Sequence, residues 1–593
     1  MANGFGSLYI GSSGLKNSLN ALNTTSNNLA NVDTTGYVRQ QVRFADETYT
    51  TFNTTAAISN QQSGLGVTIS DVVHARDVFL DKAYRAESGR QAFYAASYEA
   101  CDEVYTYYQE LDGEAFQDGL EDLWTAFQEL AKTPSDSITQ NLVVQKASLF
   151  LSRTQAVYSG LKSYQTNLNE QISDDIDTVN ELGQKIYKLN LEIQKIEAGG
   201  VETAMTLRDE RDSCLDQLSS YANISYKELA DGIVKVTIEG QDFVTEDKCY
   251  EMGKMVDKVT DFITPYWPQL SDEENGQYTK VFDLTREVSS ENNTDIGEIK
   301  ALLFARGDRV ANYTDIEGLD ADTYNKTTLD HIATGDSVML TAQAELDKLF
   351  HSIITSINDL LCPNITASEA GITTPMTATY TEDGVTKTIT ITSDTLVLDA
   401  ENCSVGSDEQ LPPQELYTRI GVSRYTTVEG ADGKTYYVYN EEDTSDETKM
   451  YTTNGVTLNE NLQKLGSLLP HLNQDKTEDA EATVNYDLAE KLATIWDTVQ
   501  ITLNPNDTGS YTFADYYAAM IGEMGTLGSV YDTTATSLSG TVTSVDSQRQ
   551  QVMGVSSDEE LTNMIKFQNA YNANSRFINV IDEMIEILLT QLG

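Results

Sequence analysis

The final segment of the chain carries an apolar row that repeats like the seam of a coiled coil. Its members lie alternately three and four residues apart, so one helix face would present Met564, Phe567, Tyr571, Asn574, Ile578, Ile581, Ile585, Leu588 and Leu592. Only Asn574 is polar, and a lone polar residue in such a seam commonly fixes its register. Ser556 and Glu559 have the spacing of a capping box at the helix start. A repeat this long predicts a helix that pairs with a partner; the simpler alternative is a helix packed in a globular core.

The first 30 residues contain a second stripe of this kind. Leucines recur every seven residues, with one more in the intervening row: Leu8, Leu15, Leu22, Leu29 and Leu19. The same stretch is rich in glycine and asparagine, each of which lowers helix propensity by roughly half a kcal/mol or more relative to alanine. Such a helix forms only against a partner. We expect it to end near residues 33–36, with Gly36 in the left-handed conformation.

The charge of the chain is concentrated between these two ends. In total 39 Lys and Arg stand against 92 Asp and Glu, a net charge of -53. Residues 1–60 sum to zero (three basic, three acidic) and residues 561–593 to -1 (two basic, three acidic), which leaves -52 for residues 61–560. This charge argues against binding to nucleic acid or to an anionic membrane. Near-neutral ends suit a crowded interface, although chance variation in composition would explain the charge pattern about as well.

Composition and processing signals leave the compartment open. A chain of 593 residues with 40% hydrophobic side chains should fold, into about four domains by length alone. It has neither an apolar run of ~18 residues for a membrane span nor a basic and apolar start for a cleaved signal peptide. The five cysteines are widely spaced without a CxxC pair, which argues against a disulfide framework and a zinc ribbon. Taken alone, these features indicate the cytoplasm.

The middle of the chain alternates between helical and strand patterns. A helical period over residues 137–198 stops at Gly199-Gly200, and a second helix follows through Leu207, Leu215 and Leu218. The alternating charges of residues 206–212 should form surface pairs three or four residues apart. After Tyr221 the period changes to two, and helical signals return from residue 486 onward. We therefore expect a mainly α fold with β insertions.

Three dipeptides indicate β-hairpin turns within the inserted regions. They are Asp231-Gly232, Asp383-Gly384 and Asp432-Gly433, each between segments of strand character. The last two lie in residues 361–475, which we expect to form a β-rich outer insertion.

No constellation of catalytic or metal-binding residues emerges from the sequence. The four histidines form no HExxH motif, and neither a Walker loop nor a nucleophile elbow is present. Residues 320–322 open like a calcium loop, but Asn325 replaces the required glycine and His331 the terminal glutamate. We therefore expect no enzyme activity, no cofactor and no metal site.

Both ends resemble a known class of proteins. NNLANVDTTGY at residues 27–37 resembles the N-terminal signature of bacterial flagellar rod, hook and hook-associated proteins, and FQNAYNANSR at 567–576 resembles their C-terminal motif. Further stretches resemble the hook-associated protein 1 family, whose members join hook to filament. These are LRDERD at 207–212, GEIKALL at 297–303, FADYY at 513–517 and GVSSDEE at 554–560. The resemblance does not extend to residues 361–475.

The resemblance implies a non-enzymatic adaptor with a discontinuous domain order. A terminal coiled coil would comprise residues 1–60 and 550–593, a helical shaft 61–225 and 476–549, a mixed region 226–360 and a variable β-rich outer insertion 361–475. The two terminal stripes would form the assembly seam, disordered in the free subunit and paired in the assembled tube.

The resemblance also implies partners and a location. The partners would be the flagellar hook protein, the second hook–filament junction protein, further copies of the chain in a ring or helical oligomer, and an export chaperone before secretion. Export through the flagellar type III system without a cleaved signal peptide would place the chain outside the cell, in the flagellum. Alternatives are another axial protein, such as the second junction protein or hook protein, a secreted adhesin or binding module with 361–475 as its functional part, or an enzyme within 361–475.

Overall fold

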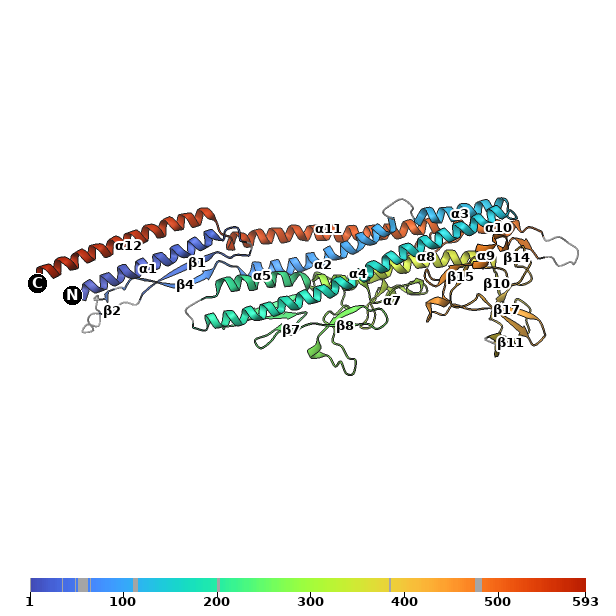
Figure 1. Cartoon of the computed structure of the whole chain (residues 1–593), viewed down its shortest axis with the longest axis horizontal. Coiled ribbons are helices and arrows are strands. Elements are labelled where there is room, and N and C mark those ends of the chain that lie inside the picture. The colour runs from blue at the N-terminus through green and yellow to red at the C-terminus, as the bar shows by residue number, and fades with distance from the viewer. Residues whose placement is uncertain are drawn as a thin grey trace.

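The computed structural model describes residues 2–34, 36–47, 50–51, 62–63, 65–109, 116–199, 203–382, 385–474 and 483–592. A pair of long terminal helices forms one end of an elongated molecule, a helical body its middle, and β structure the other end (Figure 1). This arrangement confirms the expected fold class, mainly helical with inserted sheets.

The terminal pair consists of α1 (Ala2–Ala30) and α12 (Ser557–Leu592), which lie side by side (Figure 1). The antiparallel strands β1 (Gln40–Asp46) and β4 (Val67–His74) run beside them, with the short pair β2 (Thr50–Thr51) and β3 (Gln62–Ser63). Helix α1 ends before Gly36, whose φ of 79° is left-handed as expected. Both chain ends lie at the same end of the molecule (Figure 1).

Long helices build the body around one apolar core. They are α2 (Val78–Gln109), α3 (Phe116–Lys132), α4 (Ser137–Glu197), α5 (Met205–Tyr221), α6 (Glu298–Arg306), α8 (Val338–Leu361), α10 (Tyr486–Thr498) and α11 (Phe513–Met553). Helix α4 has 61 residues and ends one residue before the predicted limit. Its N-terminus is capped by Asp136, whose side chain accepts from the Ile138 N–H. The helix predicted from the periodic apolar residues of this segment is therefore confirmed.

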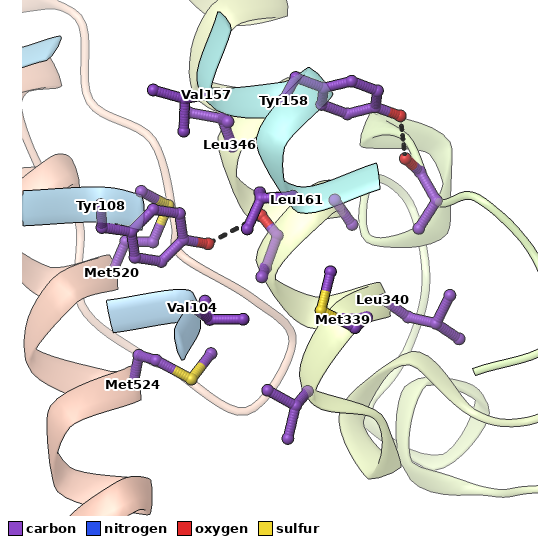
Figure 2. Packing of buried hydrophobic residues seen from close by; sticks show 14 of the residues in the cluster. Val104, Tyr108, Val157, Tyr158, Leu161, Met339, Leu340, Leu346, Met520 and Met524 are labelled. Atoms are coloured by element: carbon purple, nitrogen blue, oxygen red, sulfur yellow. Dashed lines mark hydrogen bonds between the residues drawn. The ribbon is translucent and has the colours of Figure 1, made fainter. Parts of the chain in front are cut away.

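Buried aromatic side chains tie the helices of the core together. The Phe150 ring lies 5.9 Å from Phe350, joining α4 to α8. Figure 2 shows how two tyrosines keep their hydroxyls satisfied inside this core: Tyr108 donates to the Ala342 carbonyl (2.9 Å) and Tyr158 to the Ala311 carbonyl (2.7 Å). The hydroxyls of these two buried rings are therefore paired.

The β structure lies on the body and at its far end. Strands β5 (Ile224–Glu228), β6 (Val234–Ile238) and β7 (Gln241–Val244) form one sheet, and β8 (Gly253–Val256) pairs with β9 (Ile263–Tyr266). The outer six-stranded sheet has the order β10-β13-β17-β16-β11-β12. Its strands are β10 (Asn364–Thr366), β11 (Met376–Glu382), β12 (Val385–Ile391), β13 (Leu396–Leu398), β16 (Tyr425–Gly430) and β17 (Thr435–Tyr439).

Short elements complete the fold. They are α7 (Ala321–Asn325), α9 (Glu460–Lys464), β14 (Ser404–Val405), β15 (Tyr417–Arg419), β18 (Val456–Leu458) and β19 (Leu472–Asn473). Within the described ranges, 3-10 turns accompany them at Pro268–Leu270, Tyr313–Asp315, Thr334–Asp336, Glu447–Lys449 and Gly466–Leu468.

Two of the three predicted hairpin turns lie where the sequence placed them. Gly232 (φ 83°) lies between β5 and β6, and Gly433 (φ 76°) between β16 and β17. Asp383-Gly384 lies outside the described residues, but the flanking strands β11 and β12 pair antiparallel.

Residues 361–475 divide between two cores. The outer sheet encloses a small core of its own, which includes Ile372, Ala378 and Val428. Tyr417, Tyr451 and other side chains of the same range join the main core of the body. Among the described residues, no helix is long and apolar enough to cross a membrane.

Candidate assembly site at the paired terminal helices

Two glycines allow α1 to approach α12 closely. A Cβ atom on Gly11 would lie 2.8 Å from Cγ1 of Ile578, and one on Gly14 would lie 2.7 Å from Oδ1 of Asn574. Both distances are below any normal carbon contact, so a side chain at either position would force Ile578 or Asn574 to move or the helices to separate. Gly11 and Gly14 lower the helix propensity of α1, yet their lack of a side chain favours its close packing against α12.

The predicted row of α12 is mostly covered within one chain. Its members from Met564 to Ile585 are buried or half-buried: Met564, Phe567, Tyr571, Asn574, Ile578, Ile581 and Ile585. The Phe567 ring lies 6.0 Å from Phe44 on β1. Leu588 is 55% exposed, and the Leu592 side chain lies outside the described residues. The row therefore faces the terminal pair itself except near the end of α12.

The leucine row of α1 lies beside the buried face. Leu8, Leu15, Leu22 and Leu29 are half-buried, and Leu19 is 41% exposed. The buried face instead presents small and polar residues at helical spacing: Gly11, Gly14, Asn17, Ser18, Ala21, Thr25 and Asn28. Sequence reasoning missed this second row, although its spacing of three and four was visible. The role of the leucines in assembly stays a prediction.

A second apolar row on α12 is exposed. It consists of Phe577, Val580, Met584 and Ile587, which lie three or four residues apart near the end of the helix and are between 44% and 58% exposed. Large apolar side chains clustered along one exposed helix face indicate a surface that another protein covers. With the half-buried leucines of α1, this row leaves the terminal pair incompletely covered.

Asn28 is the centre of a group of hydrogen bonds at the base of the terminal pair, where α1 ends and α12 begins. We call this group the hub. Asn28 is 1% exposed, and its Nδ2 donates to the Gln40 carbonyl (2.9 Å) and to Oε2 of Glu560 (3.1 Å). Its Oδ1 accepts from the Tyr37 hydroxyl (2.8 Å) and the Gln40 N–H (3.0 Å). Burial, followed by the charges of Asp209 and Glu560, raises the pKa of Tyr37 to about 12, so its hydroxyl remains a donor. Asn28 thus joins α1, β1 and α12.

The start of α12 is held partly by Arg39. Arg39 Nε donates to Oε1 of Glu560 (2.9 Å), and its Nη1 lies 2.7 Å from Oε2 of Glu559. Ser556 Oγ accepts from the Glu559 N–H at 3.4 Å, as the capping box requires. The Glu559 carboxylate, which the capping box assigns to the Ser556 backbone, pairs with Arg39.

The charges of residues 206–212 do not form the expected surface pairs; that prediction is wrong. Arg211 is 1% exposed and donates to Asn190 on α4 and to the Gly232 carbonyl. Asp209 accepts from the Val38 N–H (3.2 Å), and Asp212 pairs with arginines outside α5. Because α5 packs between other elements, its charged side chains reach partners far away in the sequence.

The region that opens like a calcium loop has a structural role. Asp320 caps α7 by accepting from the Thr323 N–H at 2.8 Å. Over the described ranges, no group of three or more His, Cys, Asp or Glu side chains is arranged to hold a metal ion.

Three family models match the chain in order. "Flagella basal body rod protein" matches residues 8–37, "Flagellar hook-associated protein FlgK helical domain" residues 102–372, and "Flagellar basal body rod FlgEFG protein C-terminal" residues 547–592. The first and last of these cover most of α1 and α12, the helices of the candidate assembly site. The chain is also similar to the flagellar hook junction protein FlgK of Burkholderia pseudomallei, with a TM-score of 0.46, 13% identity, and coverage of 80% of this chain and 100% of that one.

Whole-length relatives carry one name. Flagellar hook-associated protein 1 of Bacillus subtilis is 24% identical over 585 residues, which cover 97% of this chain and 95% of the relative. The proteins of the same name from Salmonella typhimurium and Escherichia coli are 21% and 20% identical, each over 97% of this chain and 98% of the relative. The order of the family matches agrees with these end-to-end relatives: along nearly its whole length, the chain is similar to flagellar hook-associated protein 1.

Proposed function

We propose that the chain is a structural adaptor of the bacterial flagellum that joins hook to filament. The observation that supports this most strongly is the terminal pair, which presents an uncovered apolar row on α12. Residues 1–60 and 561–593, which supply most of this pair, carry net charges of zero and -1, so neighbouring copies can pack there without strong repulsion. Burying a large apolar side chain contributes roughly 1.5–3 kcal/mol when burial is complete. A repeated row of this kind favours a stacked inner layer.

The domain order follows from this role. Residues 1–60 and 550–593 would form the inner layer, residues 61–225 and 476–549 the shaft, and 226–360 and 361–475 the outer parts that carry much of the acidic surface. The inner layer would rest on the hook protein, support the second junction protein and contact further copies of the chain laterally. An export chaperone would cover the apolar row before secretion through the flagellar channel, without cleavage of a signal peptide.

This role requires no catalysis. The hydrogen-bonding groups described at the terminal pair connect segments of the chain to each other, as a structural role needs.

Electron microscopy of a strain that lacks the chain tests the proposal. We expect intact hooks on the cells and filaments or filament protein released into the medium, with attachment restored when the chain is supplied again. Filaments that remain attached to hooks without the chain would contradict the proposal.

A further inference from the structure

The main apolar core of the body does not include the terminal pair. All its buried members lie between Phe93 and Met524, and none belongs to α1, β1, β4 or α12. Two connections lead from the body to the terminal pair: the segment between β4 and α2, and the segment between α11 and α12. Something other than this core must therefore fix the direction in which those connections leave the body.

Six charged side chains form a closed ring at that place. In cyclic order they are Arg76, Asp81, Arg549, Asp216, Arg85 and Asp212, and each contacts the next. We call this set the ionic ring. Its charges alternate and sum to zero, and every member has two partners of opposite charge within the ring.

The contacts of the ring are short and largely shielded from water. Arg549 Nε lies 2.9 Å from Asp81 Oδ1, and its Nη2 lies 2.7 Å from Asp216 Oδ2. Arg85 Nε lies 2.6 Å from Asp216 Oδ1, while Arg76 contacts Asp81 (2.6 Å) and Asp212. The Arg85 and Arg549 side chains are 3% and 4% exposed. Such planar, multiply bonded arginines hold a defined geometry, which isolated surface pairs do not.

Aromatic rings cover two of the arginines. The Arg549 guanidinium lies 4.1 Å from the centre of the Tyr84 ring, and that of Arg85 lies 4.4 Å from the Tyr226 ring. Stacking fixes the planes of both guanidinium groups and adds cation–π attraction.

The ring gathers the two connections onto α5. Arg76 lies two residues after the end of β4, and Arg549 lies in the last turns of α11 before α12. Asp212 and Asp216 belong to α5, the same helix whose Asp209 accepts from the Val38 N–H after α1. Both connections are therefore tied to one rigid helix of the body.

We propose that the ionic ring positions the terminal pair relative to the body, so that Arg76, Arg85 and Arg549 are positioning residues for assembly. The proposal rests on the proposed function, because the orientation matters once the inner layer is built. An apolar joint would be non-directional, whereas a closed ring of charges is satisfied in one arrangement.

The variant Arg549→Met tests whether the ring positions the terminal pair, separately from any effect on the folding of the body. The change removes one arginine, yet Asp81 keeps Arg76 and Asp216 keeps Arg85, so neither carboxylate becomes unpaired. We expect the thermal midpoint of the body to stay near that of the wild type, while the number of hooks that carry filaments falls about tenfold. Arg549→Lys, which keeps the charge but not the fork of donors, should give an intermediate number.

A matched variant distinguishes loss of position from loss of stability. Arg306 is 2% exposed and bonds to Asn169 and the Ile263 carbonyl, away from the ring. Arg306→Met should lower the thermal midpoint without reducing filament attachment below that midpoint. If Arg549→Met lowers the midpoint as far as Arg306→Met does, or if it leaves filament attachment at the wild-type level, the positioning role is excluded.

A distance measurement tests the orientation directly. Glu192 on α4 and Lys566 on α12 are both exposed and can each be replaced by a genetically encoded keto residue that carries a spin label. The distance between the two labels, measured with the chain seated on isolated hooks, reports how the terminal pair lies relative to the body. We expect one narrow distance distribution for the wild type and for Arg306→Met, and one at least twice as wide for Arg549→Met. Equal widths for Arg549→Met and the wild type would overturn the proposal.

Failure of the ring and failure of the adaptor role give different results. Ile578→Asp places a charge against Gly11 in the terminal pair and leaves the ring untouched. If Ile578→Asp abolishes filament attachment while Arg549→Met does not, only the inference about the ring fails. If neither change affects attachment, the proposed function fails as well.

Discussion

The signature residues of the N-terminal segment act through hydrogen bonds more than through packing. Asn28 satisfies both groups of its side-chain amide, and all four partners lie on other parts of the terminal pair or its connection. A carboxamide is the side chain that offers donors and acceptors together at this length. Sequence reasoning could identify the motif that contains Asn28, but not these partners, because Glu560 lies 532 residues away.

Replacing this amide should loosen the base of the pair. Asn28→Ala leaves the Gln40 backbone and the buried Glu560 carboxylate short of partners, at a cost of about 1–3 kcal/mol. We expect faster hydrogen exchange in the first turns of α12 in the assembled state. Asn20→Ala, at an exposed position of the same helix, is the control and should leave the exchange unchanged. Equal exchange in both variants would mean that the hub is not formed.

Buried carboxyl groups make the stability of the body depend on pH. Burial, and then the charge of Glu298, raises the pKa of Asp175 to about 7, and burial raises that of Asp347 to about 6. The folded state therefore binds these protons more tightly than the unfolded chain, in which the pKa of aspartate is about 4. Their contribution to stability is complete below pH ~4 and is lost as the pH rises through about 7.

Asp175→Asn should remove one source of this dependence. The variant should have a higher thermal midpoint than the wild type at pH 8 and a smaller advantage at pH 5, where Asp175 of the folded chain is largely protonated. Glu181→Gln, at an exposed position on the same helix, should show no such change between the two pH values. An advantage of equal size at both pH values would contradict the assignment.

At the scale of elements, the terminal helices show why propensity and packing must be considered together. Gly6 has open space around it, whereas Gly14 faces Asn574 at close range. Propensity counts both glycines as unfavourable by the same amount, yet only one of them is required by its neighbour. The periodic rows of α4 and α12 could be read from the sequence because they depend on spacing alone.

The two glycines offer a matched pair of substitutions. Gly6→Ala should stabilise α1 by roughly 0.5–1 kcal/mol, because alanine is the better helix former and nothing obstructs its Cβ. Gly14→Ala should weaken the pairing with α12, since Asn574 must move away. Filament attachment in complemented cells should be kept by the first variant and reduced by the second. A Gly14→Ala variant that attaches filaments as well as Gly6→Ala would show that the helices are not paired in this register.

The ionic ring marks the limit of what the sequence could predict at this scale. The charges of α5 were visible, but their partners lie more than 120 residues away on α2 and more than 300 residues away on α11. No local pattern connects such distant side chains. The spacing of the charges along α5 allows pairs within that helix, but the helices packed around α5 supply other partners, so the predicted surface pairs do not form.

At the scale of the whole molecule, the body and the terminal pair are separately stabilised. The body has its own apolar core, and the terminal pair has its own interface between α1 and α12. The charge is divided along the same line, with near-neutral ends and a strongly acidic remainder. We therefore expect the body to stay folded when the terminal pair is removed or disrupted.

Truncation tests that independence. A chain without residues 564–593 should retain the cooperative thermal transition of the body, because the core contains no residue of α12. The same chain should fail to join hook and filament, as seen by electron microscopy of complemented cells. Filaments that grow normally from hooks carrying the truncated chain would contradict the adaptor role. Loss of the thermal transition would show that folding of the body depends on α12.

The position of the two termini has a practical consequence. Because both ends of the chain lie together at the end of the terminal pair, a peptide tag or fluorescent domain fused to either one would occupy the proposed inner layer and obstruct stacking. The β11–β12 hairpin lies at the opposite end of the molecule, in a sheet with a separate small core (Figure 1). Labels for imaging or purification should therefore be placed in that hairpin, far from the proposed inner layer.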